Sequence, residues 1–262
     1  MQQWDMLNLL HELHLRTHTG PCTYGRTSLP RAGLEEDELC RLLCPRGRLE
    51  LPREPYNEVY PGILLGDGTT ALCVGMLRRL GVTHVLNAAC GRDSSLCLVN
   101  TGPALYRAAG IRFLGIEALD MAGFRLDHFF EEAAEFIDCA LAEPGGRVYV
   151  HCHQGISRSA TLVIAFLMLR RRLSAREAVR LVRARREIVP NRGFLRQLCL
   201  LEHRLTRTGN HGMPTRRPIV SGCGNRLCHC GGVPDGAAYR SAVHPKGSWA
   251  SDPCTLQTPF SS

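Results

Sequence analysis

The sequence predicts an α/β fold in which helices flank a central, mostly parallel sheet. Between residues 56 and 206, short apolar runs typical of buried strands alternate with longer apolar patterns at helical spacing. One unit of this kind joins a strand at 148–150, a short loop, and an apolar run of helical length at 160–169. Strands that alternate with helices indicate helices packed on a sheet. Ligand sites in such folds lie beyond the carboxyl ends of the strands, so the residues after 150 are the first candidates.

The first half of this region contains three predicted strands and one helix. The apolar run 63–65 indicates the first strand, and the β-branched run 82–86 indicates the second. A helix that includes residues 77–80 is expected between them. The run 111–116 indicates a third strand.

The second half begins with a longer helix, because apolar residues recur there at helical spacing on one face over four turns. Gly145 and Gly146 end that helix, and a strand leads to His151. Beyond the helix that follows this strand, Ser174 and Glu177 have the spacing of a capping box. A last helix is expected over 194–205. The residues of the amphipathic face are Leu126, Phe129, Phe130, Ala133, Phe136, Ile137, Ala140 and Leu141.

Composition divides the chain into three parts. Residues 1–55 are expected to form an N-terminal extension with a short acidic helix around Leu34 to Leu43. Residues 56–206 form the predicted domain. Residues 207–262 are rich in Gly, Pro, Ser and Cys with little periodic apolar content, so we expect a disordered tail. Neither a signal peptide nor a membrane span is expected, and 13 cysteines without a leader indicate a reducing compartment.

The net charge of +8 is moderate, and many arginines lie in one stretch. Within that stretch only Glu177 and Glu187 oppose them. The stretch is either a solvated helix face or a surface that steers acidic partners toward the site. Nucleic-acid binding is not expected, because interleaved aromatic residues are missing. The arginines are Arg170, Arg171, Arg172, Arg176, Arg180, Arg183, Arg185 and Arg186.

Two groups of possible metal ligands do not have a convincing spacing. Cys223, Cys228, His229 and Cys230 lack the second cysteine pair that zinc sites usually have. The histidines of the first twenty residues are too few for a site. We therefore expect no metal and no cofactor.

The loop between the strand at 148–150 and the following helix has the residues of an anion site with a nucleophile. Cys152 is followed by Gly155 and Arg158. A strand, a tight loop and a helix in this order direct backbone N–H groups and the positive end of the helix toward one point. Such a nest binds a phosphate-sized dianion and favours a thiolate over a thiol. Arg158 can add a planar, bidentate fork, so the predicted chemistry is attack by sulfur on phosphorus.

The segment His151-Cys152-His153-Gln154-Gly155-Ile156-Ser157-Arg158-Ser159 resembles the His-Cys-x-x-Gly-x-x-Arg-Ser signature of the cysteine-dependent protein phosphatases. Its length and surroundings are similar to those of the small, atypical dual-specificity phosphatases. The resemblance covers residues 56–206 and implies the cysteine-phosphatase fold. Its further landmarks are Tyr56 to Pro61, Gly81 to Ala89, and Pro190 to Leu195.

The resemblance also implies a general acid. A positioned carboxylic acid that protonates the leaving oxygen raises the rate by about 10² to 10⁴. Asp120 matches the position of the family's general-acid aspartate and precedes a loop with Gly123. Asp127 is the alternative, but it precedes the amphipathic helix, where aspartate is a natural N-cap.

The remaining site residues surround the nucleophile. His151 is expected to orient the loop, and Ser159 to stabilise the thiolate when it leaves, as the resemblance implies. Asn191 matches a landmark, for which we expect a supporting hydrogen bond. The residues expected to bind the substrate are His153, Gln154, Gly155, Ile156, Ser157 and Arg158.

The resemblance implies an enzyme that hydrolyses phosphotyrosine, phosphoserine and phosphothreonine of proteins through a phosphocysteine intermediate. Two alternatives stay open: a catalytically weak protein that binds phosphosites, and a phosphatase of a non-protein substrate. Phosphorylated proteins are the expected partners, with MAP kinases as one candidate class, although residues 1–55 are too short for a kinase-docking module. We expect the protein in the cytoplasm, the nucleus or both.

Overall fold

The computed structural model describes residues 31–44 and 50–207. The expectations for the first thirty residues and for 208–262, including the cysteine cluster at 223–230, lie outside these ranges. Within them, no helix is long and apolar enough to cross a membrane.

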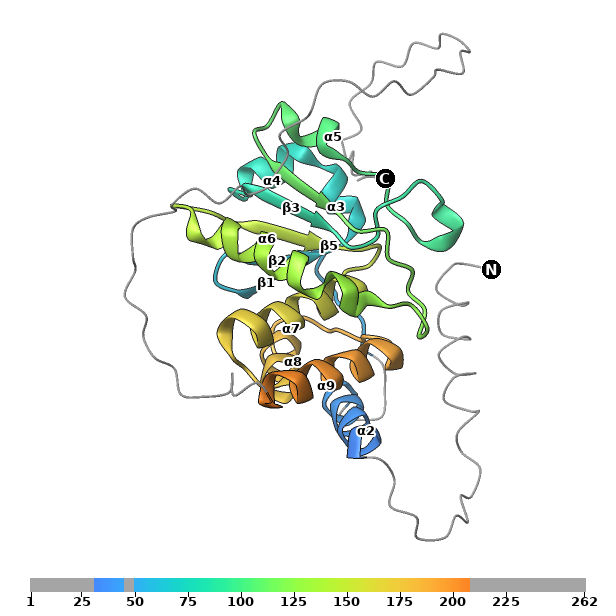
Figure 1. Ribbon diagram of the computed structural model, residues 1–262. Coiled ribbons are helices and arrows are strands. Elements are labelled where there is room, and N and C mark those ends of the chain that lie inside the picture. Colours follow the sequence, from blue (N-terminus) through green and yellow to red (C-terminus); the bar gives the residue numbers. More distant parts are fainter. Residues whose placement is uncertain (1–30, 45–49, 208–262) are drawn as a thin grey trace, which may run out of the picture.

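A five-stranded sheet forms the centre of the fold (Figure 1). Strand β1 lies at one edge and pairs antiparallel with β2, whereas all other neighbours are parallel. The mostly parallel sheet predicted from the sequence is confirmed. In spatial order the strands are β1 (Tyr56–Tyr60), β2 (Ile63–Gly66), β5 (Val148–His151), β3 (His84–Asn87) and β4 (Arg112–Gly115).

Helices cover both faces of the sheet (Figure 1). One face carries three short helices, which are α3 (Gly68–Leu72), α4 (Val74–Arg79) and α5 (Pro103–Arg107). The other face carries a thicker layer, which contains α6 (Phe130–Ala142), α7 (Arg158–Arg171), α8 (Ala175–Arg183), α9 (Arg192–Arg207) and the outermost helix α2 (Arg31–Leu43). Two short 3₁₀ turns complete the fold, η1 (Ser94–Leu96) and η2 (Leu126–Phe129).

Side chains of the strands alternate between the two layers, as the two-residue period of a strand requires. In β5, Val148 and Val150 belong to the core beneath α7, whereas Tyr149 belongs to the core beneath the short helices. In β2, Leu64 likewise belongs to the core beneath the short helices, whereas Ile63 and Leu65 belong to the core of the thicker layer. All four residues of β5 are buried because helices cover both faces, which explains why the strand has no polar alternation in its sequence.

Helix α7 is the centre of the thicker layer. All of its residues from Arg158 to Met168 are buried, between the sheet, α6, α8 and α9. A helix covered on every side needs no polar face, and its sequence from Leu162 to Leu169 is accordingly apolar. The predicted capping box at the start of α8 is confirmed: Glu177 N donates to Ser174 Oγ at 3.2 Å, and Ser174 N donates to a Glu177 carboxylate oxygen at 2.9 Å.

One strand and two α-helices were not predicted, and each is short or weakly patterned. Strand β1 has a single buried residue, Val59, so its alternation is faint. Helices α3 and α5 have five residues each, which is too few for a helical period to appear. The predicted strands at 82–86 and 111–116 are shifted or shortened at their ends, because Val82 and Ile111 are buried just outside the sheet ladder.

The arginine-rich stretch is not one cationic face. Two part-buried members pair with acids from distant segments: Arg170 Nη1 lies 3.1 Å from Glu131, and Arg171 Nη1 lies 2.9 Å from Asp138. Arg186 is buried and lies at the loop that follows β5. A solvated helix face therefore describes only part of this stretch, and the steering of acidic partners stays a prediction.

Candidate active site

The loop that contains Cys152 leaves the carboxyl end of β5 in the middle of the sheet and ends where α7 begins at Arg158. Gly155 turns this loop with a φ of +70°, a conformation that favours glycine. A Cβ on Gly155 would lie 2.2 Å from the Gly66 carbonyl oxygen, so the close approach of β2 also requires glycine. The signature glycine is thus needed for the shape of the loop.

Hydrogen bonds on the outside of the loop orient its amides. A peptide unit is planar and trans, so its carbonyl oxygen and its N–H point in opposite directions. Every carbonyl from 152 to 156 accepts a hydrogen bond from an outer group, and the N–H groups of 153 to 157 therefore point inward. Gly155 N donates to Cys152 Sγ at 3.3 Å, as this orientation requires. The outer donors, in loop order, are His151 Nδ1 (3.0 Å), Gly68 N (3.0 Å), Arg186 Nη2 (3.1 Å), Arg186 Nε (2.9 Å) and Val189 N (2.8 Å).

The Cys152 thiol is buried and free, and its environment favours the thiolate. Burial by itself raises its pKa, but the positive charge of Arg158 and hydrogen bonds from Ser159 outweigh burial, so the net pKa lies below the ordinary value. Ser159 Oγ donates to Cys152 Sγ at 3.2 Å. A thiolate here is the nucleophilic form of cysteine.

Arg158 is almost completely buried beside the thiol, with 2% of its surface exposed. Its Nη1 donates to the Ala118 carbonyl at 3.0 Å and its Nη2 to the Cys97 carbonyl at 3.1 Å. Arg158 Nε has no hydrogen-bond acceptor within residues 31–44 and 50–207, and it lies 3.7 Å from Asp120 Oδ2. An unsatisfied buried guanidinium N–H is costly unless a ligand accepts from it, and an anion in the loop would supply that acceptor.

Asp120 lies on the loop after β4 and reaches the same place. Its Oδ1 accepts from Ser157 Oγ at 2.8 Å and from Asn191 Nδ2 at 2.9 Å. About a third of the side chain is exposed, 34%, so a substrate can reach the carboxyl group. The supporting hydrogen bond expected of Asn191 is present, and Asn191 Oδ1 also accepts from Phe194 N at the start of α9.

Asp127 lies elsewhere, and its predicted role as an N-cap is wrong. A 3₁₀ turn, η2, precedes α6, so the helix begins three residues later and its N-cap position is Phe129. Both carboxylate oxygens of Asp127 accept from Arg125, at 2.8 and 2.9 Å, and these hydrogen bonds lower its pKa. A carboxylate held ionised by an arginine is a poor proton donor.

His151 is fully buried behind the loop. Burial lowers the pKa of His151 to about 4, so the ring is neutral near neutral pH. Its Nδ1–H donates to the Cys152 carbonyl, whereas Nε2 has no partner among the described residues. These contacts fit the orienting role expected from the sequence.

Of the six residues expected to bind the substrate, three line a cavity and three do not. The side chains of His153, Gln154 and Ile156 line a cavity of about 620 Å³ next to the loop. Ser157 instead turns its hydroxyl toward Asp120, and Gly155 contributes backbone alone. Arg158 lies inside the loop. The cavity therefore extends the site beyond the place where a phosphate would lie.

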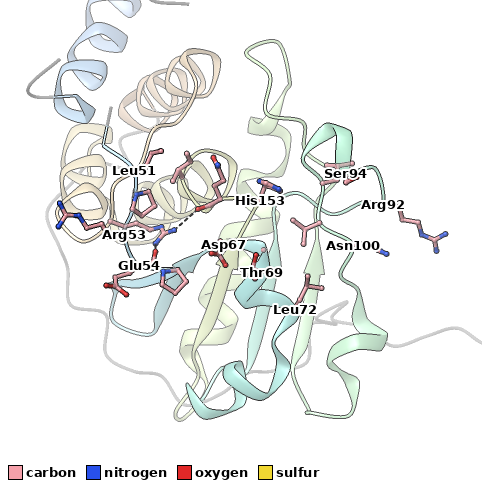
Figure 2. Close-up of a pocket in the computed structure, with 18 residues that line it drawn as sticks. Leu51, Arg53, Glu54, Asp67, Thr69, Leu72, Arg92, Ser94, Asn100 and His153 are labelled. Atoms are coloured by element: carbon pink, nitrogen blue, oxygen red, sulfur yellow. Dashed lines mark hydrogen bonds between the residues drawn. The ribbon is translucent and has the colours of Figure 1, made fainter. Parts of the chain in front are cut away.

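Figure 2 shows the walls of this cavity. Leu51, Arg53 and Glu54 form one side, and the loop of Arg92, Ser94 and Asn100 forms the other, with His153 between them. Asp67, Thr69 and Leu72 lie along the floor. Leu72 is 52% exposed although it is apolar.

Arg186 is the residue of the site that sequence reasoning did not identify. Its sequence signal was hidden, because it follows many other arginines and lies beyond the end of α8. Within the described residues, no group of three or more His, Cys, Asp or Glu side chains could hold a metal ion.

The chain is similar to known proteins in sequence and in fold. The family described as the dual specificity phosphatase catalytic domain matches residues 63–204. Dual specificity protein phosphatase 26 of Bos taurus is 51% identical over 149 residues, which cover 57% of this chain and 68% of that protein. Human dual specificity protein phosphatase 13B is 47% identical over 151 residues, 58% of this chain and 74% of that protein. The crystal structure of human DUSP28 has a TM-score of 0.51 at 30% identity and covers 60% of this chain and 99% of that one.

Proposed function

The chain belongs to the dual specificity phosphatase family, and from that membership we propose that it dephosphorylates proteins through a phosphocysteine formed on Cys152. It is a dual specificity protein phosphatase, and phosphorylated proteins are its substrates. The observation that carries the proposed mechanism is the placement of Cys152, Arg158 and Asp120 around one loop of inward-pointing amides. A protein that only binds phosphosites would not need all three groups.

Binding of the phosphate dianion uses groups that are already in place. The inward N–H groups of the loop and the start of α7 supply hydrogen bonds and positive potential. Arg158 Nε supplies a buried donor that lacks an acceptor among residues 31–44 and 50–207. Because these donors are fixed before the substrate arrives, little reorganisation accompanies the change of charge at phosphorus.

In the first step the Cys152 thiolate attacks phosphorus. The S–P bond forms while the ester P–O bond breaks, and the leaving oxygen takes a proton from the Asp120 carboxylic acid. Ser157 and Asn191 hold the carboxyl group through its Oδ1, which leaves Oδ2 for the substrate. The product alcohol or phenol then departs.

In the second step water hydrolyses the phosphocysteine. Asp120, now a carboxylate, takes a proton from the water, whose oxygen forms a bond to phosphorus as the S–P bond breaks. The departing thiolate is stabilised by the hydrogen bond from Ser159 Oγ and by the charge of Arg158. Phosphate and the free enzyme result.

The cavity beside the loop supports a role in binding the polypeptide around the phosphorylated residue. Its lining is mostly apolar, and His153, Gln154 and Ile156 connect it to the nucleophile. On this proposal Leu72→Asp lowers kcat/KM for phosphopeptides more than kcat/KM for a small aryl phosphate. An equal effect on both substrates would argue against it.

Two finer assignments complete the proposal. We place MAP kinases among the candidate phosphoprotein substrates, and we place the enzyme in the cytoplasm, the nucleus or both. The free thiol of Cys152 supports a reducing compartment, where such a nucleophile stays reduced.

Hydrolysis of a small aryl phosphate tests the proposed mechanism, with reductant and without added metal. Turnover by the wild type should disappear in Cys152→Ser and fall strongly in Asp120→Ala. Phosphopeptides that carry phosphotyrosine or phosphothreonine then compare the two substrate classes. A folded, reduced wild type without turnover would instead favour a protein that binds phosphosites.

A further inference from the structure

Arg186 is an almost completely buried arginine outside the reaction centre, with 1% of its surface exposed. It lies just after α8, in the connection to α9. Burial of a guanidinium is expensive unless its N–H groups are satisfied. Four hydrogen bonds satisfy this one, and all of them go to the protein.

Two of these hydrogen bonds hold the catalytic loop. Arg186 Nε donates to the Gly155 carbonyl at 2.9 Å, and its Nη2 donates to the Gln154 carbonyl at 3.1 Å. Both carbonyls are thereby held on the outside of the loop. Because each peptide unit is planar, the N–H groups of Gly155 and Ile156 are held facing inward.

The other two hydrogen bonds hold the guanidinium in place. Arg186 Nη1 donates to the Glu54 carbonyl at 3.0 Å and to Asn57 Oδ1 at 2.8 Å. Glu54 belongs to the wall of the cavity, and Asn57 belongs to β1. A planar fork can make all four contacts at fixed angles, whereas a lysine ammonium cannot.

We propose that Arg186 is a positioning residue that orients the amides of the catalytic loop, and thereby favours the Cys152 thiolate and the bound phosphate. It acts on the reacting groups through Gln154 and Gly155, and it also borders the cavity beside the loop. Asn57 assists by fixing the guanidinium from behind. This inference rests on the proposed mechanism, since it assumes that the Cys152 thiolate is the reacting group.

The test uses the full chain and the variants Arg186→Lys and Arg186→Met. The first readout is the pH dependence of Cys152 alkylation by iodoacetamide, which reports the thiol pKa without any turnover. The second is inhibition by vanadate, a phosphate analogue. Arg147→Met is the matched control. The Arg147 guanidinium likewise donates hydrogen bonds within the protein, to the Leu80 carbonyl and the Glu58 carboxylate, but it lies before β5, at the end away from the loop.

We expect both Arg186 variants to raise the pH midpoint of alkylation by about one unit and to weaken vanadate inhibition about 10- to 100-fold, as misplaced catalytic groups do. kcat/KM should fall by a similar factor. Arg147→Met should keep the wild-type midpoint. Folded Arg186 variants with the wild-type midpoint and wild-type vanadate inhibition would overturn the proposal. A rise in KM for phosphopeptides alone would also overturn it, because that pattern indicates direct contact with the substrate.

If neither Arg186 variant folds, Asn57→Ala provides the test. It removes one hydrogen bond from the guanidinium and none from the loop, so a smaller shift of the alkylation midpoint in the same direction is expected. An unchanged midpoint in Asn57→Ala would then reject the proposal. Wild-type protein without a depressed Cys152 midpoint and without turnover would contradict the mechanism itself, which is a different result.

Discussion

Asp120→Asn removes the proposed general acid while keeping a side chain of the same size. Asp120 Oδ1 accepts from Ser157 Oγ at 2.8 Å and from Asn191 Nδ2 at 2.9 Å. The amide oxygen of an asparagine can accept the same two hydrogen bonds, so the variant should fold and keep the loop intact. The change therefore removes the acidic proton, together with the charge that lies 3.7 Å from Arg158 Nε, and keeps the other contacts.

The expected loss depends on the leaving group. A positioned general acid contributes about 10² to 10⁴ in rate, or about 3 to 5 kcal/mol of barrier. The full loss is expected for phosphoserine and phosphothreonine peptides, because an alkoxide is a poor leaving group without a proton. When the phenol of an aryl phosphate is acidic, it leaves readily as the phenolate anion. The loss of kcat/KM for such a substrate should therefore be about tenfold or less.

The assay is kcat/KM across a series of substrates with increasingly acidic leaving groups. kcat/KM reports the steps up to cleavage of the ester bond, so the second role of Asp120 as a base does not enter it. Asp127→Asn is the control, since its carboxylate is held by Arg125 away from the loop. An equal loss for every leaving group, or wild-type activity on phosphoserine peptides, would refute Asp120 as the acid.

Three further predictions follow from the same contacts. Ser159→Ala removes a hydrogen bond that lowers the pKa of the Cys152 thiol, so alkylation by iodoacetamide should shift about one unit to higher pH; an unchanged profile would contradict this. Burial lowers the pKa of His151 from 6.5 to about 4. Between these two pH values the histidine is protonated in the unfolded chain and neutral in the folded one. The free energy of unfolding should therefore fall by about 3 kcal/mol as the pH falls through this window, and urea titrations of His151→Gln should lack that part of the slope. Gly155→Ala adds a Cβ 2.2 Å from the Gly66 carbonyl at a positive φ, so circular dichroism should show a lower melting temperature together with lost activity; a wild-type melting temperature would show that the loop relaxes freely.

Much of the fold could be predicted because its strongest patterns are local. Strand β5 is buried throughout and α7 is buried from Arg158 to Met168, so the short apolar strand and the long apolar run at 160–169 both show in the sequence. The capping box of Ser174 and Glu177 depends on four consecutive residues. The family resemblance extended these local patterns to the arrangement of the sheet.

Other features depend on contacts between distant residues, and the sequence does not display them. The N-cap assignment of Asp127 failed because η2 extends the start of the helix and Arg125 takes the carboxylate. Arg186 looked like one more arginine of a charged stretch. Its burial depends on carbonyls of a loop 31 residues earlier and on Asn57, 129 residues earlier. Only the folded structure brings these groups together.

A covalent phosphate on Cys152 is the most direct test of the account. Asp120→Asn should form the intermediate from an acidic aryl phosphate and hydrolyse it slowly, because the base for the second step is missing. Acid quenching, digestion and mass spectrometry should then find one phosphoryl group on the peptide that contains Cys152. Turnover without phosphate on that peptide, or turnover that persists in Cys152→Ser, would contradict the account.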